Sequence, residues 1–331
     1  MGTLNHFGLV AWCAGIAACI GLTAWFGIAD VGNAVASVGW GMPLVVLARA
    51  ATVGVAGVGW WLLFPANGRL GLRPAVLLRF VREAVNTLLP LTQVGGDIIG
   101  ARLVTFWGVP GPLGAASLII DVLMQAATQF LFGALGLLTL LALGADATVA
   151  AIAAAGLALA APLLGGFYFA QRGGGHRILH FVLSRLKQDG SWRVLGTVDA
   201  VYQSLAAIYA GRSNIVASSL VHMTGWLIGV AEVWIVLAFM GQPVTIAEAL
   251  VIESLLQAVR GAAFAIPSAL GAQEAGLILL CGIFAIPPDQ ALALALTKRA
   301  ADLAVGVPGL IALQILEGER VTASHFRRER P

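Results

Sequence analysis

The residues of this sequence that could do chemistry gather in one stretch of an otherwise apolar chain, from Arg82 to Arg102. The candidate site residues in it are Arg82, Glu83, Asn86, Gln93, Gly95, Gly96, Asp97 and Arg102. Pro90 and the glycine pair would break a helix in mid-course. The apolar flanks, residues 76–89 and 94–107, are shorter than the roughly 20 residues of a membrane span. A polar loop between two spans is the simpler alternative, but two short arms around a break favour a re-entrant hairpin.

A second polar stretch, from Arg260 to Glu274, repeats the landmarks of the first. A proline, an acid and a second proline recur at a constant offset of 177 residues: Pro90 with Pro267, Asp97 with Glu274, and Pro110 with Pro287. The other candidate site residues are Asp121, Gln125, Arg260, Gln273, Glu274, Lys298, Arg299 and Asp302. We therefore predict two related hairpins, in repeats around residues 74–143 and 246–316.

Charged and amide side chains recur at helical spacing, so each group shares one helix face. The groups are Arg79, Arg82, Glu83 and Asn86; Asp121, Gln125 and Gln129; Glu253, Gln257 and Arg260; and Lys298 with Asp302. An ionisable side chain at the centre of a membrane helix costs about 2.5 kcal/mol or more. These faces should therefore meet one another or a cavity, and not lipid. Buried ion pairs that only hold helices together, such as Lys298 with Asp302, are the alternative to a binding site.

A helix that is broken at membrane depth leaves free N–H groups and the positive end of its dipole in the interior. With the arginines and Lys298 nearby, such ends suit a phosphate or another anionic head group. The glycine pair would let a ligand approach the backbone closely, and Ser268 would cap the second arm. Asp97 and Glu274 oppose a purely anionic site. They could pair with Arg82 or Arg260, bind a cationic group or carry a proton.

The sequence offers little for other kinds of chemistry. The three cysteines lie in apolar runs, and the five histidines are scattered without the spacing of a metal site. No nucleophile–base pair, nucleotide-binding loop or cofactor motif is recognisable. We therefore predict a protein that is not an enzyme and holds no metal and no cofactor.

The composition is typical of a polytopic membrane protein. Of 331 residues, 59% are hydrophobic and 11% are charged, and the mean hydropathy is +0.92. Soluble domains have about 25% charged residues. Six spans are expected, at residues 7–28, 40–64, 113–143, 149–170, 215–240 and 289–316. In this interpretation residues 1–331 form a single membrane domain, with a cytoplasmic amphipathic linker at 171–214. The net charge of +3 gives no reason to expect a nucleic acid partner.

The basic residues predict the orientation in the membrane. The segments 65–82, 171–214 and 317–331 carry 14 of the 19 lysines and arginines, which places both termini in the cytoplasm. With six spans, the first hairpin then enters from the cytoplasm and the second from outside. We predict an all-α polytopic membrane protein with about six transmembrane helices and two oppositely oriented re-entrant hairpins in an inverted repeat. Such repeats place a substrate site near the bilayer midplane.

The motif residues resemble a known family. They are Asn86, Pro90, Gly95, Gly96, Asp97 and Arg102, followed by Pro267, Gly271 and Glu274. This pattern resembles the flippase-like transmembrane region of bacterial lysylphosphatidylglycerol synthases over about residues 7–316. The single-domain branch linked to hopanoid biosynthesis (the HpnL type) is most similar, through the run Q-V-G-G-D-I-I-G-A-R-L. Ser268 and Ala269 stand where relatives often carry a glycine pair.

The resemblance implies lipid translocation across the bacterial inner membrane. We expect a flippase or scramblase for a polar or anionic lipid, such as a hopanoid, phospholipid or glycolipid, with membrane lipid as the partner. A secondary transporter of a small ion or solute is the alternative, and an integral-membrane enzyme acting on lipid is the third hypothesis. The soluble aminoacyl-transferase domain of the synthases has no counterpart here, so lipid aminoacylation is not expected. A homodimer and contacts with lipid-biosynthesis proteins remain open.

Overall fold

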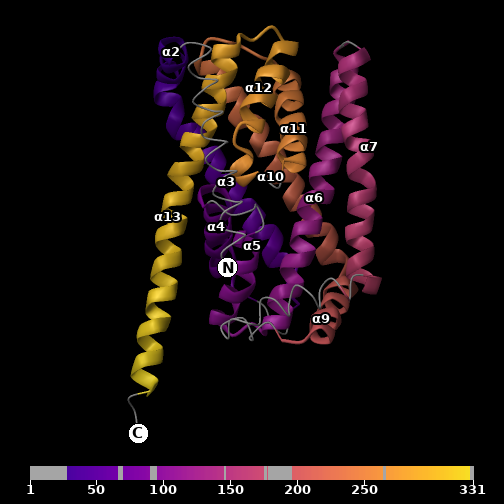
Figure 1. Ribbon diagram of the computed structural model, residues 1–331, viewed down its shortest axis with the longest axis vertical. Helices are drawn as coiled ribbons and strands as arrows, with labels where there is room; N and C mark the ends of the chain where they lie inside the picture. Colours follow the sequence, from indigo (N-terminus) through magenta and orange to yellow (C-terminus); the bar gives the residue numbers. More distant parts are fainter. Residues whose placement is uncertain are drawn as a thin grey trace.

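The computed structural model describes residues 28–65, 70–89, 95–144, 147–174, 177, 196–263 and 266–328. All regular secondary structure in these ranges is helical, and the helices run along one long axis as a bundle (Figure 1). The α-helices are α2 (Ile28–Val38), α3 (Met42–Leu62), α4 (Leu72–Leu88), α5 (Gly95–Leu103), α6 (Gly111–Ala142), α7 (Ala147–Phe169), α9 (Val198–Ala210), α10 (Arg212–Phe239), α11 (Ile246–Ala262), α12 (Ala272–Ile283) and α13 (Pro288–Arg328). Short 3-10 turns are η1 (Gly39–Gly41), η2 (Val104–Trp107) and η5 (Pro267–Ala269), and η3 (Ala170–Gly174) is a π-turn.

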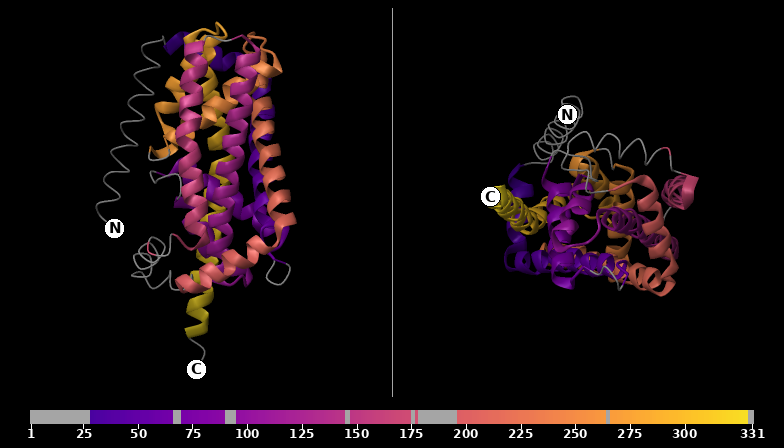
Figure 2. Two further views of the ribbon diagram at one scale, coloured as in Figure 1. Left: turned by 90° about the vertical axis from the view of Figure 1, so that its right-hand side faces the viewer. Right: turned by 90° about the horizontal axis from the view of Figure 1, so that it is seen from below.

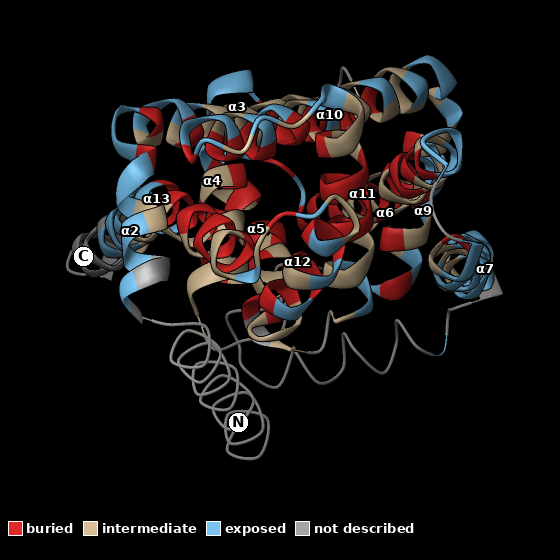
Figure 3. Ribbon diagram, turned by 90° about the horizontal axis from the view of Figure 1, so that it is seen from above, coloured by how far each residue is buried: buried red, intermediate tan, exposed pale blue. Residues whose placement is uncertain are grey.

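Five helices in the described ranges are long and apolar enough to cross a membrane, so the chain is an all-α polytopic membrane protein. They are Gly32–Leu62, Gly111–Ala142, Ala147–Arg172, Arg212–Phe239 and Pro288–Gly318. These helices correspond to the second to sixth expected spans. The first, residues 7–28, lies almost entirely outside the described residues. The helix α7 is the most exposed of the five and stands at the edge of the bundle (Figure 3), as expected for a helix that faces lipid.

Two pairs of shorter helices form the hairpins. α5 has 9 residues and α12 has 12, fewer than the roughly 17–25 of a transmembrane helix. α5 packs against α4, and α12 packs against α11. The first pair lies in one half of the bundle and the second pair in the other half (Figure 1). Each pair therefore enters the bundle from its own end and turns back inside it.

The helix bounds keep the offset found in the sequence. α5 begins at Gly95 and α12 at Ala272, while α6 begins at Gly111 and α13 at Pro288, so both pairs of starts are 177 residues apart. Asp97 and Glu274 are consequently both the third residue of their helix. The two acids occupy the same place in the two hairpins.

Apolar side chains pack into two clusters, and each cluster holds one hairpin. One cluster joins α10, α11 and α12 with the first turns of α13. The other joins the end of α3 with α4, α5, the first half of α6 and α9, which lies across the end of the bundle (Figure 2). Buried polar side chains are therefore concentrated where the two halves meet.

Candidate functional site

A cavity of about 330 Å³ lies between the two hairpins. Its wall is contributed by α3, α4, α5, α6, α10, α11 and α13. The ionisable side chains that line it are Arg49, Arg79, Glu83, Asp97, His222, Glu232, Glu253, Arg260, Lys298 and Asp302, and the amide side chains are Asn86, Gln125, Gln129 and Gln257. Apolar spans thus surround an interior that carries charges of both signs.

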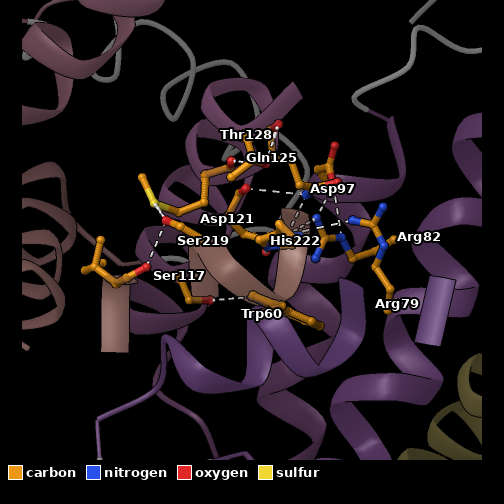
Figure 4. Close-up of polar contacts among 12 residues, drawn as sticks. Trp60, Arg79, Arg82, Asp97, Ser117, Asp121, Gln125, Thr128, Ser219 and His222 are labelled. Atoms are coloured by element: carbon orange, nitrogen blue, oxygen red, sulfur yellow. Dashed lines mark hydrogen bonds and ion pairs between the residues drawn. The ribbon is translucent and has the colours of Figure 1, made fainter. Parts of the chain in front are cut away.

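Arg82 on α4 connects the first hairpin to the neighbouring helix. Its guanidinium lies 2.6 Å from Asp97 on α5 and 2.7 Å from Asp121 on α6 (Figure 4). Asp121 also lies 3.0 Å from Nε2 of His222 on α10. The guanidinium stacks 4.7 Å from the ring centre of Trp60. Arg82 and Asp121 are fully buried, so this network forms the inner wall behind the cavity.

Arg49 on α3 connects the first hairpin to α13. Its guanidinium lies 2.5 Å from Glu83 and 2.6 Å from Asp302. Glu83 also accepts a hydrogen bond of 3.1 Å from Arg79, one turn before it on α4. A single arginine from an apolar span therefore neutralises one acid of each repeat.

Lys298 on α13 connects two further helices. Its ammonium lies 3.1 Å from Glu253 on α11 and 3.3 Å from Glu232 on α10. All three side chains are buried. Two carboxylates thus share one cation, a compact arrangement that compensates charges removed from water.

The tip of the second hairpin is held by Glu274 of α12 and Arg299 of α13. Glu274 accepts a hydrogen bond from the Gly271 backbone at 2.7 Å and pairs with Arg299. Gly271 has a φ of 81°, a left-handed conformation that glycine adopts freely. Ser268 and Ala269 also have positive φ values, 55° and 48°, which is unfavourable for residues with a Cβ. The Ser268 hydroxyl donates a hydrogen bond to the Thr87 carbonyl of the first hairpin.

Arg260 differs from the other cations that line the cavity. Arg49, Arg79 and Lys298 each have a carboxylate partner within 3.3 Å. Arg260 forms no hydrogen bond or ion pair with any residue that the structure describes. Its charge also acts on Glu83, but no acid is hydrogen-bonded to it, and a half-buried guanidinium without such a bond is costly in the interior of a protein. This side chain is therefore available to an anionic ligand.

Three glutamines add hydrogen-bond acceptors to the same wall. Each uses its amide nitrogen for a bond inside the protein: Gln125 to Asp121, Gln129 to the Gln257 carbonyl, and Gln257 to Glu253. Carboxylate and carbonyl oxygens only accept, so the nitrogen must face them and the Oε1 atom stays available as an acceptor. The cavity thus offers one unpaired cation and several acceptors.

The predicted site residues divide into four groups. Glu83, Asn86, Asp97, Gln125, Arg260, Lys298 and Asp302 line the cavity. Arg82, Asp121, Gly96, Gln273, Glu274 and Arg299 lie in the walls or the hairpin tips, and Gly95 begins α5. Gln93 lies outside the described residues. Arg102 does not line the cavity and pairs with Glu317 at 2.7 Å.

Two further expectations need correction. Lys298 and Asp302 do not pair with each other, since each finds its partners on other helices. Glu274 pairs with Arg299 and not with Arg260. The ion-pair partners across a bundle are set by the packing of helices, which spacing along one helix does not reveal.

The hairpin tips also differ from the expected ligand cradle. A Cβ on Gly96 would lie 2.1 Å from the Arg82 carbonyl oxygen, so this glycine lets α5 approach α4 and not a ligand. The Gly96 N–H donates to Asn86 at 2.6 Å, and Gly271, not Ser268, caps α12. Some of the backbone N–H groups that were expected to bind an anion therefore donate to acceptors within the protein.

Several cavity residues were not among the predicted site residues: Arg49, Arg79, Gln129, His222, Glu232, Glu253 and Gln257. Arg79, Gln129, Glu253 and Gln257 belong to the polar faces read from the sequence, so extending each face would have found them. Arg49 and Glu232 are single charges in apolar spans, which is itself a signal. In the described part of the chain, no group of three His, Cys, Asp or Glu side chains could hold a metal ion.

Comparison with known proteins places this architecture in a family. Residues 12–309 match the family model described as the lysylphosphatidylglycerol synthase TM region. The chain belongs to this family. The match covers the five described spans up to the middle of α13, together with both hairpins and the cavity between them, and it indicates a function connected with membrane lipids. None of the curated proteins and none of the solved structures compared with the chain matches it.

Proposed function

We propose that this protein is a flippase or scramblase that moves a lipid with a polar or anionic headgroup across the membrane. The observation that carries this proposal is the charged cavity between two half-length hairpins, inside a bundle of apolar spans. Ionisable side chains at membrane depth are costly and mark pathways for polar groups. Membership of a lipid-related family supports a lipid as the cargo.

The cavity dimensions favour a headgroup over a whole lipid. About 330 Å³ is at the lower end of small-molecule pockets, which measure roughly 300–1,000 Å³. The headgroup would occupy the cavity while the acyl chains stay in the bilayer. Arg260 would contact an anionic group such as phosphate, and the glutamine oxygens would accept hydrogen bonds from hydroxyl or ammonium groups.

The arrangement of the hairpins supports movement by alternating access. The hairpins approach the cavity from opposite ends of the bundle and are joined at their tips by Ser268 and Thr87. Displacing one hairpin against the other would open the cavity to one side at a time, as in inverted-repeat transporters. The ion pairs of Arg49 and Arg82 join the first hairpin to α3, α6 and α13, so they would resist this displacement.

Purified protein in liposomes tests the proposal. Vesicles would carry fluorescent phospholipid or glycolipid in both leaflets, and a membrane-impermeant quencher would report how fast lipid exchanges between them. We expect exchange above that of empty vesicles for at least one headgroup class. Equal rates in empty and loaded vesicles for every headgroup would contradict the proposal. Uptake of a small ion or solute without lipid exchange would instead favour a secondary transporter.

Mass spectrometry of the same lipids separates transport from catalysis. We propose that the protein is not an enzyme, so every lipid should keep its mass while its leaflet changes. A modified lipid that appears only with the protein would identify a lipid-modifying enzyme. The hopanoid-linked branch can be tested in the same assay by comparing a hopanoid probe with a phospholipid probe.

We also propose a location and an orientation. The protein would lie in the bacterial inner membrane with both termini in the cytoplasm. The reason is that the segments rich in lysine and arginine, 65–82, 171–214 and 317–331, are expected on the cytoplasmic side. A reporter fused after residue 331 should be active only in the cytoplasm. Crosslinking in native membranes would test a homodimer and contacts with lipid-biosynthesis proteins.

A further inference from the structure

A second cavity lies at the end of the bundle, away from the cavity between the two hairpins. It measures about 500 Å³ and lies between the π-turn after α7, the helix α9 and the start of α10. Its described lining includes two arginines, Arg172 and Arg212, and no acidic residue. Neither arginine has an ion pair or hydrogen bond with any described residue. The described lining of this cavity thus presents two cations and no anion.

Arg172 is held in place by aromatic rings. Its guanidinium lies 5.3 Å from the ring centre of Tyr168 and 5.1 Å from that of Tyr209. The two rings are themselves in edge-to-face contact at 6.1 Å. A contact between a cation and an aromatic ring gives the guanidinium no oxygen acceptor, so its N–H groups remain available to a ligand. An arginine whose only role is to set the orientation of the protein in the membrane would need no such contacts with aromatic rings.

Hydrogen bonds fix the rings and the turn around this arginine. Tyr209 donates to Oε1 of the buried Gln171 at 2.6 Å, and Gln171 reaches the Ile119 carbonyl of α6. Tyr202 donates to the Ala170 carbonyl at 2.9 Å. Burial and, to a smaller extent, Tyr168 raise the pKa of the Tyr209 hydroxyl to about 12, while the positive charge of Arg172 acts in the opposite direction. This hydroxyl therefore keeps its proton. π-turns are frequent at functional sites.

We propose that this second cavity binds the phosphate group of an anionic phospholipid from the leaflet at this end of the bundle. Arg172 and Arg212 would supply the N–H donors, and the tyrosine rings would border the headgroup. α9 lies across this end of the bundle, beside α6 and the turn that follows α7 (Figure 1). Basic pockets between helices at the cytoplasmic surface suit phosphate headgroups. The site does not depend on the proposed transport, since it is separate from the first cavity.

Binding of short-chain phosphatidylglycerol to the purified full-length protein tests this proposal, with phosphatidylcholine as the neutral lipid. The variants are Arg172→Gln, Arg212→Gln and the double change. Arg73→Gln is the matched control, because Arg73 is an exposed arginine in the first turn of α4, a helix that packs in the same apolar cluster as α9. We expect phosphatidylglycerol to bind more tightly than phosphatidylcholine. The preference should fall at least tenfold in Arg172→Gln and stay within about fivefold in the control, the value for one surface cation.

Replacing the rings gives an independent readout. Tyr168→Leu with Tyr209→Leu keeps both arginines but removes the stacking, and it should weaken binding as much as Arg172→Gln does. An equal loss of affinity for phosphatidylglycerol in Arg73→Gln and Arg172→Gln would mean that only the surface charge matters, and it would overturn the proposal. Unchanged affinity in the variant without the two tyrosine rings would overturn it as well. Inorganic phosphate is the third probe. If it competes with the lipid at equal concentration, the site would be one for a free anion, and the assignment to phospholipid would be wrong.

Discussion

The hydroxyl of Ser268 donates a hydrogen bond to the backbone carbonyl of Thr87, and this bond joins the tips of the two hairpins. The two residues are 181 positions apart in the chain. If the hairpins move against each other during transport, this bond has to break. α4 of the first hairpin also packs along α3 and α13, so these helices would have to slide against it or move with it.

Removing this bond should ease hairpin movement. We expect Ser268→Ala to lower the free energy of unfolding by about 1 kcal/mol, the net value of one hydrogen bond, and to raise the rate of lipid exchange. Thr224→Ala is the control, because the Thr224 hydroxyl bonds only within its own helix. Thermal unfolding and the liposome assay would be compared. A lipid-exchange rate that falls in parallel with stability would argue against hairpin movement.

Asp121 holds the buried network of Arg82 and His222 together. Asp121→Asn leaves the fully buried Arg82 with one carboxylate fewer and should cost about 3–5 kcal/mol of folding free energy. Glu317→Gln breaks the partly exposed pair with Arg102 and should cost no more than about 1 kcal/mol. Unfolding temperatures in detergent measure the difference. Equal shifts would mean that Asp121 is solvated and the network is not buried.

Gly96 allows the two arms of the first hairpin to pack closely. Gly96→Ala would bring a methyl group to 2.1 Å from the Arg82 carbonyl, so the arms must separate. We expect a loss of about 1–3 kcal/mol, as for other overpacked sites, together with loss of lipid exchange. Gly282→Ala in α12 meets nothing within 4 Å and should be neutral or stabilising by up to about 1 kcal/mol. Similar stabilities of the two variants would exclude close packing as the role of Gly96.

Arg260 should act on the ligand and not on the fold. We expect Arg260→Gln to weaken binding of anionic headgroups by roughly 10- to 100-fold, since hydrogen bonds to charged groups contribute about 1.5–3 kcal/mol. The unfolding temperature should change little because Arg260 has no partner among the described residues. Arg260→Lys keeps the charge and should retain part of the binding. A neutral glycolipid is the internal control, and an equal loss for that lipid would contradict a contact with an anionic group.

Lys298 should be needed for folding because it separates Glu232 from Glu253. Lys298→Met leaves two carboxylates facing each other, so stability should fall by several kcal/mol. Adding Glu253→Gln should recover part of this loss, which a double-mutant cycle of unfolding measurements would detect. Additive losses would show that the two side chains are not coupled.

The class of fold and the breaks between helices could be predicted from the amino-acid sequence. Apolar runs of span length gave the long helices α3, α6, α7, α10 and α13, because a helix in lipid must satisfy its backbone internally. The prolines and glycines placed the hairpin turns, and the 177-residue offset matched the starts of α5 and α12. These properties are local, so composition and spacing are enough to reveal them.

Which charged side chains pair with each other depends on how the helices pack. Spacing paired Lys298 with Asp302 on one helix, but packing gave Lys298 to Glu232 and Glu253 and gave Asp302 to Arg49. An ion pair in the interior forms with whichever opposite charge the packed helices bring within a few ångströms, and that charge is often distant in the chain. For the same reason, the sequence contained Arg260 but could not show that it alone, among the described arginines and lysines of the cavity lining, forms no ion pair or hydrogen bond with a described residue.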